Sequence, residues 1–285
     1  MNSRLLHLPE GSERVLDADE EVFILYSRPT PPPSDEHRGL GYLDSNTDTL
    51  TLAFNLTTPD LPSDVKKKRR KGALREKTVE VELAQDKTSL RSRTGDTGSV
   101  VWKASVDFAQ MILQQQYSPA SSPLLDFEEL RGSHILELGS GTGLLSVVLA
   151  RFVHHYTATD IAELLPLIRK NATLNLANVR VEELNWETLH STPASRRNLV
   201  FPPHDPPVDL ILVVDCIYHP SLVGPLLSAI DHSGSLVLVV MELRADDVTR
   251  AFLEGWLSLG NWEIWRVEPG FAADNPYVMW VGWKI

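Results

Sequence analysis

Short apolar runs alternate with amphipathic segments from about residue 100 onward. The apolar runs predict strands buried in a sheet, and segments whose apolar positions recur every three or four residues predict helices. Strands are expected at residues 133–138, 156–160, 179–184, 208–215, 235–242, 262–267 and 277–283. Helices are expected at residues 106–116, 143–152, 163–176, 220–231 and 246–259. Repeated strand–helix units favour an α/β fold with a parallel, doubly wound sheet.

The last two expected strands, at residues 262–267 and 277–283, leave no room for a helix between them. Parallel neighbours need a long crossover, usually a helix, whereas antiparallel neighbours can be joined by a short connection. We therefore expect an antiparallel hairpin at one edge of the sheet, close to the C-terminus.

Residues 1–98 show a different pattern, and we expect a small β-rich extension there, with the α/β domain over residues 99–285. Strands of the extension are expected at residues 22–26 and 77–83 and in a hairpin with arms at residues 41–44 and 49–54. The clear alternation at residues 77–83 is that of a half-buried strand. The polar, basic residues 57–75 predict a flexible insertion, and the Pro- and Arg-rich residues 187–207 predict a long loop.

The composition is that of an ordinary globular chain, with 42% hydrophobic and 23% charged residues among 285. Cys216 is the single cysteine, so we expect neither an internal disulfide framework nor a metal site. The first residues lack the apolar run of a secretory signal, and no apolar stretch reaches the length of a membrane span. These features favour a reducing compartment, the cytoplasm, without membrane association.

The formal net charge of the chain is −11. Lys and Arg at residues 66–71 contribute +6, so the rest of the chain carries −17. An acidic body disfavours direct binding of nucleic acid and favours basic protein partners, although acidity also serves solubility alone. The basic run is best explained as a solvated loop, with a nuclear import signal as the alternative.

Three glycines at alternate positions, Gly139, Gly141 and Gly143, follow the strand expected at residues 133–138 and precede a helix. Glycine adopts positive φ readily and lets the backbone approach a ligand closely. A strand that turns through glycines into a helix is typical of a site for a nucleotide-like cofactor. A dinucleotide site would have the spacing G-x-G-x-x-G, and here Leu144 stands where its third glycine belongs.

Asp160 ends the next expected strand, about 20 residues after the glycines. An acidic residue at this place accepts hydrogen bonds from ribose hydroxyl groups. The alternative is a role as the N-cap of the following helix. Its position at the carboxyl end of a strand favours ribose binding.

The pattern of Glu137 and three alternating glycines, followed by Asp160, resembles S-adenosylmethionine-dependent methyltransferases with a Rossmann-like seven-stranded sheet. Four further segments narrow the resemblance: Val-Val-Trp-Lys at 100–103, Asn-Trp at 185–186, Asp-Cys-Ile-Tyr at 215–218 and Glu-Leu-Arg-Ala-Asp-Asp at 242–247. They resemble the protein lysine methyltransferases with an Asp-x-x-Tyr motif after strand four. The fungal ribosomal lysine N-methyltransferase 5 family is most similar, with the animal valosin-containing-protein lysine methyltransferase as a relative. The resemblance covers most of residues 20–285.

The resemblance implies S-adenosyl-L-methionine as the cofactor. Its binding residues would be Trp102, Glu137, Gly139, Ser140, Gly141, Asp160, Trp186 and Val214. Glu137 would interact with the α-amino group of the cofactor, the alternative being a salt bridge at the sheet edge. Trp186 would stack on adenine. Trp102 would lie against the cofactor or, alternatively, join the extension to the domain as a core aromatic residue.

Asp215 and Tyr218 are the catalytic candidates that the resemblance implies: Asp215 would face the incoming amine and Tyr218 would line the lysine channel. The lysine must lose its proton before it attacks, and a narrow, partly apolar channel lowers its pKa. Asp215 would favour the charged form of the lysine, and no general base is identified. His219 is better explained as a helix-start residue, and Cys216 as a small buried hydrophobic residue.

The resulting hypothesis is a monomeric protein-lysine N-methyltransferase that acts on a basic protein, namely a large-subunit ribosomal protein of the L1 type by resemblance. One alternative is a methyltransferase for another protein or a non-protein substrate. Against a nucleic-acid substrate, the motif Asn/Asp-Pro-Pro-Tyr/Phe is absent at residues 215–218. The other alternative is a cofactor-binding partner protein without enzyme activity.

Overall fold

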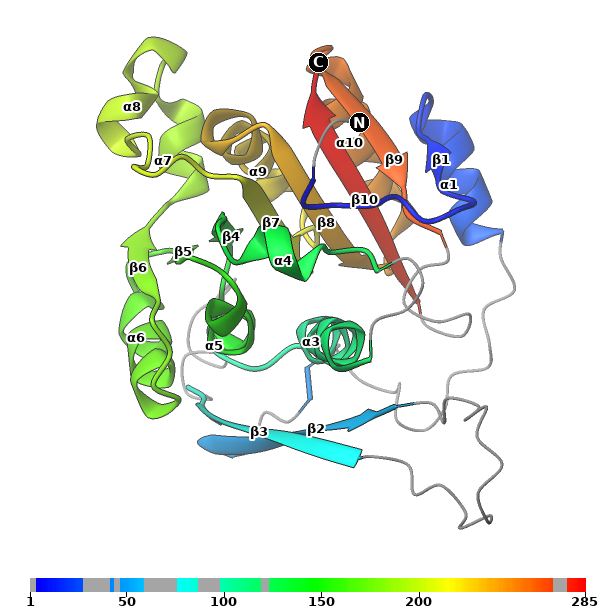
Figure 1. Ribbon diagram of the computed structural model, residues 1–285. Coiled ribbons are helices and arrows are strands. Elements are labelled where there is room, and N and C mark those ends of the chain that lie inside the picture. Colours follow the sequence, from blue (N-terminus) through cyan, green and yellow to red (C-terminus); the bar gives the residue numbers. More distant parts are fainter. Residues whose placement is uncertain are drawn as a thin grey trace, which may run out of the picture.

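An eight-stranded sheet is the centre of the computed structural model, which describes residues 4–27, 42–43, 47–58, 76–86, 98–118, 123–268 and 276–285 (Figure 1). The strand order is β1-β9-β10-β8-β7-β4-β5-β6. The strands are β1 (Glu13–Arg14), β4 (His134–Leu138), β5 (His155–Asp160), β6 (Arg180–Glu183), β7 (Leu210–Val214), β8 (Leu236–Glu242), β9 (Trp262–Arg266) and β10 (Tyr277–Lys284). Strands β8, β7, β4, β5 and β6 are parallel, whereas β10 runs antiparallel to both β8 and β9. The predicted α/β sheet with a C-terminal antiparallel hairpin is therefore confirmed.

Helices cover both faces of this sheet (Figure 1). One face carries α3 (Lys103–Tyr117), α5 (Leu144–Leu149) and α6 (Leu165–Leu174), and the other carries α1 (Ala18–Tyr26), α9 (Pro220–Ser233) and α10 (Asp246–Ser258). Successive residues of a strand point to opposite faces, so each central strand contributes to both cores. Leu210 and Leu212 of β7 enter the first core, and Ile211 and Val213 enter the second.

A separate two-stranded sheet, β2 (Thr49–Thr57) and β3 (Glu76–Ala84), lies outside α3 and α6 (Figure 1). The two strands pair antiparallel from Thr49↔Ala84 to Thr57↔Glu76. The predicted hairpin between residues 41–44 and 49–54 is therefore wrong in its first arm. Of that arm the structure describes residues 42–43, and Tyr42 forms an isolated bridge with Trp102.

The strand predicted at residues 22–26 is also wrong, because these residues belong to helix α1. Asp17 caps the helix by accepting a hydrogen bond from the Glu20 backbone N–H at 2.9 Å, and the first turn is acidic, which favours a helix N-terminus. Val22 and Leu25, three residues apart, form the buried face, while Phe23 is exposed. A five-residue apolar run does not separate strand from helix by periodicity, and here the cap and the packing of Val22 and Leu25 together favour the helix.

Residues 187–207 are not one long loop. They contain most of α7 (Trp186–Ser191), the short helix η3 (Ala194–Arg196) and α8 (Arg197–Val200). Asn185 starts α7 by accepting a hydrogen bond from the Thr188 backbone N–H at 3.0 Å. Short helices α4 (Phe127–Leu130) and η2 (Ala150–Phe152) complete the described elements.

The N-terminal residues contribute to the main sheet rather than forming a purely β-rich extension. Strand β1 pairs with β9, and α1 packs against α10. The division of the chain at residue 98 stays a prediction, and most of the basic insertion, including residues 66–71, lies outside the described residues. Within the described ranges, no helix combines the length and the apolar character that a membrane crossing requires.

A buried ion network fastens α1 to the hairpin. The Arg266 guanidinium on β9, 3% exposed, pairs with Glu21 of α1 and Glu13 of β1, and its Nε donates to Glu268 at 3.0 Å. The Trp280 indole N–H on β10 donates to Glu21 at 2.9 Å. A buried carboxylate is tolerated only when it is paired and hydrogen-bonded, so Glu21 depends on both partners.

Removal of Arg266 is expected to destabilise the fold strongly. Arg266→Met removes the cation that pairs with the buried Glu21 carboxylate, and we expect a loss of about 3–5 kcal/mol in the free energy of unfolding. Glu13→Gln removes a carboxylate whose side chain is 63% exposed and should cost about 1 kcal/mol or less. Urea unfolding followed by tryptophan fluorescence measures both variants. Equal losses in the two variants would contradict the special role of the buried pair.

Candidate functional site

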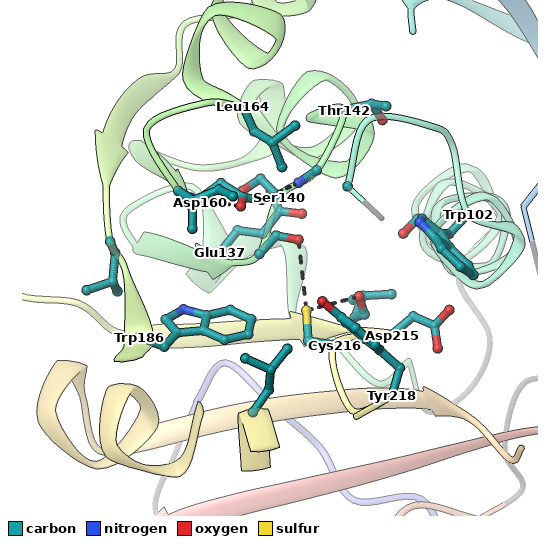
Figure 2. A pocket seen from close by; sticks show the side chains of 18 of the residues that line it. Trp102, Glu137, Ser140, Thr142, Asp160, Leu164, Trp186, Asp215, Cys216 and Tyr218 are labelled. Atoms are coloured by element: carbon teal, nitrogen blue, oxygen red, sulfur yellow. Dashed lines mark hydrogen bonds between the residues drawn. The ribbon is translucent and has the colours of Figure 1, made fainter. Parts of the chain in front are cut away.

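A cavity of about 690 Å³ opens at the carboxyl ends of the parallel strands (Figure 2). It lies where the order of strands reverses, between β4 and β7, which is the place where open α/β sheets bind ligands. The loops after β4, β5, β6, β7 and β8 and the start of α3 all contribute to its lining. The cavity is lined by all ten predicted site residues: Trp102, Glu137, Gly139, Ser140, Gly141, Asp160, Trp186, Val214, Asp215 and Tyr218.

The glycine loop adopts the turn that its sequence predicts. Gly139, Gly141 and Gly143 have φ angles of 69°, 55° and 79°, which side chains with a Cβ adopt only with strain. A Cβ on Gly139 would lie 2.7 Å from the Cys216 Sγ and 3.1 Å from the Trp186 ring. Glycine is therefore needed at this position both for its φ angle and for the close approach of two other segments.

Asp160 holds the glycine loop in place. Its Oδ2 accepts a hydrogen bond from the Gly141 backbone N–H at 2.8 Å, and its Oδ1 accepts one from the Ile161 N–H at 2.8 Å. It does not cap α6, whose N-cap is Leu164. The carboxylate lines the cavity beside the glycine backbone.

Glu137 is a buried carboxyl group without a cationic partner among the described residues. The residue is 3% exposed, and the Tyr156 hydroxyl donates to its Oε2 at 3.0 Å. No Lys, Arg or His of the described ranges pairs with it, so the salt bridge considered from the sequence does not occur there. Burial raises the pKa of Glu137 to about 8, although the Tyr156 hydrogen bond acts in the opposite direction.

Two tryptophans stand on different sides of the cavity (Figure 2). Trp186, the first residue of α7, presents its ring edge to the glycine loop, and its buried Nε1 has no hydrogen-bond partner in the part of the chain that the structure describes. Trp102 precedes α3, and the Tyr42 ring meets it edge-on with centroids 6.2 Å apart. The Arg244 guanidinium carbon lies 5.2 Å from the centre of a Trp102 ring.

Asp215 follows β7 in a strained conformation, with φ of 59° and its backbone N–H bonded to the Val240 carbonyl at 2.8 Å. Its carboxylate, 2% exposed, is held by Arg244 in a bidentate pair with both N···O distances 2.7 Å. Burial raises the pKa of the Asp215 carboxyl, and Arg244 opposes that rise. In this structure the cation that pairs with the Asp215 carboxylate is Arg244. That Asp215 also faces an incoming amine stays a prediction.

Arg244 is the functional candidate that the sequence reasoning missed. It belongs to the segment 242–247 that was used for the resemblance, but no role was assigned to it. An indication was available, since β7 and β8 were both expected as apolar parallel strands, and Asp215 and Arg244 follow them at the same sheet edge. Opposite charges at neighbouring strand ends are expected to pair.

Three residues that follow Asp215 in the sequence, Cys216, Tyr218 and His219, also line the cavity. Tyr218 is 39% exposed and lines the cavity. His219 caps α9 by accepting a hydrogen bond from the Ser221 backbone N–H at 3.2 Å, which confirms its interpretation as a helix-start residue. Cys216 is buried, and burial raises the pKa of its thiol well above the ordinary value, which confirms it as a small hydrophobic residue rather than a nucleophile.

Fold and site together define a Rossmann-like α/β protein with a cavity for a nucleotide-type ligand at the switch point of its sheet. The chain belongs to the lysine methyltransferase family, whose sequence model matches residues 83–255. A ribosomal lysine N-methyltransferase 5 from Eremothecium gossypii is 27% identical over 275 residues, which cover 75% of this chain and 80% of that protein. A protein-lysine methyltransferase, METTL21E of Bos taurus, is 28% identical over 159 residues, 52% of this chain and 49% of that protein. The predicted resemblance is therefore confirmed.

One relative carries a different name. A Schizosaccharomyces pombe protein named diaminohydroxyphosphoribosylamino-pyrimidine deaminase is 31% identical over 283 residues, which cover 94% of this chain. The chain spans 56% of the length of that relative. Zinc deaminases with a His/Cys/Cys ligand set need two cysteines, and this chain has one. The name of this relative therefore does not indicate a deaminase site of that kind here.

Substitution of Gly139 tests the close packing of the loop. Gly139→Ala places a Cβ against Cys216 and Trp186, whereas Gly260→Ala has a similar φ of 71° and nothing within 4 Å of its Cβ. Both variants pay about 1–2 kcal/mol for the left-handed conformation. Overpacking adds about 1–3 kcal/mol at residue 139 alone. Urea unfolding of both variants measures the difference, and equal losses would show that φ alone requires glycine at residue 139.

Proposed function

We propose that this protein transfers a methyl group from S-adenosyl-L-methionine to a lysine side chain of a protein substrate. The observation that carries the proposal is the cavity at the switch point, which combines a left-handed glycine loop with a buried carboxyl group that no described cation compensates. Membership of the lysine methyltransferase family supports the same activity.

The residues of the cavity fit this cofactor. Glu137 would receive its α-amino group, because an ammonium group compensates a buried carboxylate. Asp160 would accept hydrogen bonds from ribose, and Trp186 would stack on adenine. The backbone of residues 139–141 would contact the methionine part, and Val214 would make a main-chain contact. When bound, the cofactor supplies a methyl group that is already activated on a sulfonium, so the chain has mainly to align the amine and exclude water.

The proposed substrate is a basic protein, and the first candidate is a large-subunit ribosomal protein. Support comes from the net charge of −11, which favours basic partners, and from relatives named ribosomal lysine N-methyltransferase 5. The choice of an L1-type protein, the monomeric state and the cytoplasmic location stay predictions. A non-protein acceptor on the same fold and a partner protein without activity are the competing functions.

Label transfer tests the function. The pure protein is incubated with S-adenosylmethionine labelled in its methyl group and with an extract of cells that lack this gene, and the labelled band is identified by mass spectrometry. We expect methylated lysine in one basic protein. Asp215→Asn should lower the labelling at least about tenfold while cofactor binding persists, because it takes the anionic partner from Arg244 and leaves a cation at the proposed acceptor side that repels the incoming lysine. Asp17→Asn, an equally good helix cap far from the cavity, is the control and should label normally.

Two results would decide for the competing functions, and a third would change the mechanism alone. Label in RNA or in a small molecule would replace the proposed substrate class. Calorimetry that detects no cofactor binding would indicate a partner protein without activity. Full labelling by Asp215→Asn would remove Asp215 from the mechanism while leaving the activity in place.

Cofactor affinity should depend on pH through Glu137. Its pKa of about 8 in the free protein means that it is protonated at pH 7, whereas binding of an ammonium group requires the carboxylate. Binding below pH 8 therefore releases a proton, and the affinity rises by up to about tenfold per pH unit from pH 6 to 8. Above about pH 8 the α-amino group of the cofactor deprotonates, and the affinity falls again.

Calorimetry in buffers of different ionisation enthalpy counts the released proton. Glu137→Gln should release none, and its affinity should be nearly constant from pH 6 to 7.5. 5′-Methylthioadenosine, which lacks the amino acid part, is the matched ligand and should bind the wild type without this pH dependence. Equal proton release by the wild type and Glu137→Gln would exclude Glu137 as the partner of the amino group.

A further inference from the structure

Arg244 connects Asp215, after β7, with Trp102, before α3, on the side of the cavity where the acceptor lysine is proposed to enter. Both of its terminal nitrogens bind Asp215 at 2.7 Å, and Nη2 also contacts Glu242 at 2.7 Å. On its other side the guanidinium lies over Trp102, 5.2 Å from the ring centre. These four side chains come from three segments: Asp215 follows β7, Glu242 and Arg244 lie at and just after the end of β8, and Trp102 precedes α3.

The charge of Asp215 poses a problem for amine methylation. A bare carboxylate beside the acceptor stabilises the ammonium form of lysine, which has no lone pair for attack on a methyl group. Guanidinium stays protonated at all accessible pH values, and its fork matches a carboxylate. Arg244 therefore compensates Asp215 permanently while leaving the remaining carboxylate lone pairs as hydrogen-bond acceptors.

The other charged and titratable groups nearby do not replace this compensation. Glu242 is acidic, and its side chain is 21% exposed against 2% for Asp215, so solvent screens its charge more effectively. Tyr277 of β10 donates its hydroxyl proton to Asp107 of α3 at 2.9 Å, and burial raises its pKa, so it stays neutral. His219 caps α9, and the Cys216 thiol is buried and neutral.

We propose that Arg244 is a positioning residue that holds Asp215 as a compensated ion pair, so that the acceptor lysine loses its proton more easily beside Asp215 and Trp102. This inference rests on the proposed methyl transfer. The guanidinium is a fixed part of the site rather than a plug that leaves it, because its departure would break three charge-assisted hydrogen bonds and leave a buried carboxylate uncompensated.

The pH dependence of kcat tests this role, with the purified protein identified by label transfer as the acceptor. In Arg244→Gln the acceptor ammonium becomes the cation that compensates the buried Asp215 carboxylate, so the pKa of the amine rises. We expect the pH profile of kcat to move by about one unit to higher pH, with about tenfold loss at pH 7 and recovery at high pH. Arg244→Lys keeps the charge and should keep the wild-type midpoint. The double variant Asp215→Asn/Arg244→Gln removes both charges, and its midpoint should return toward that of the wild type.

Other results would contradict either the proposed role of Arg244 or the proposed function. An Arg244→Gln profile that is lowered equally at every pH, with an unmoved midpoint, would reduce Arg244 to a structural role. A lower KM and a higher kcat in Arg244→Gln would identify Arg244 as a plug. If the wild-type protein labels no protein at all, both the proposed function and the inference are wrong. If the wild type labels normally but the midpoint of Arg244→Gln does not move, the inference alone is wrong.

Discussion

The backbone turn after β4 is the constraint on which the site depends. Parallel strands bring their carboxyl ends to one edge of the sheet, and the reversal of strand order between β4 and β7 leaves a space there. The chain must leave β4 and enter α5 without filling that space. Three glycines with positive φ make this turn, and Gly139 allows Cys216 and Trp186 to approach from other segments. A Cβ on Gly141 would likewise lie 2.9 Å from the Gly98 carbonyl oxygen, so side chains at these glycines would push apart the segments that enclose the cavity.

Carboxyl groups surround the space that the turn creates, and each is stabilised differently. Asp160 accepts hydrogen bonds from two backbone N–H groups. Asp215 is compensated by Arg244. Glu137 has the Tyr156 hydroxyl and no cation among the described residues, so burial keeps it largely protonated at neutral pH. Burial without a charged partner costs stability, and groups with such perturbed pKa values occur preferentially at functional sites, which makes Glu137 a candidate functional residue.

Local sequence patterns predicted the parts of the structure that local chemistry determines. The strands and helices after residue 100 were expected in the right order because their apolar positions follow the period of each element. The glycine turn was expected because only glycine adopts positive φ without strain. Ten site residues were selected from motifs, and all of them line one cavity.

Features that depend on contacts between distant segments were not predicted from the sequence. The partner of β2 is β3, across residues 58–75, rather than the nearby residues 41–44, and register across such an insertion has no local signal. Residues 22–26 were expected as a strand because a short apolar run fits both periods, and packing of Val22 and Leu25 on the main domain decides for a helix. The pairing of Arg244 with Asp215 depends on the adjacency of β7 and β8, which was implied by the fold but not by either motif alone.

The N-terminal part of the chain is joined to the glycine loop by one buried side chain. Asn171 of α6, fully buried, accepts a hydrogen bond from the Ala84 backbone N–H at 2.7 Å, and its Nδ2 donates to the carbonyls of Ala84 at 3.0 Å and Thr142 at 2.8 Å. Gly98 also lies against Gly141, since its carbonyl oxygen would be 2.9 Å from a Cβ there. Buried amide groups keep their position only when their hydrogen bonds are satisfied. The end of β3 and the glycine turn therefore share one partner, and a displacement of the two-stranded sheet would disturb the cavity wall through Asn171.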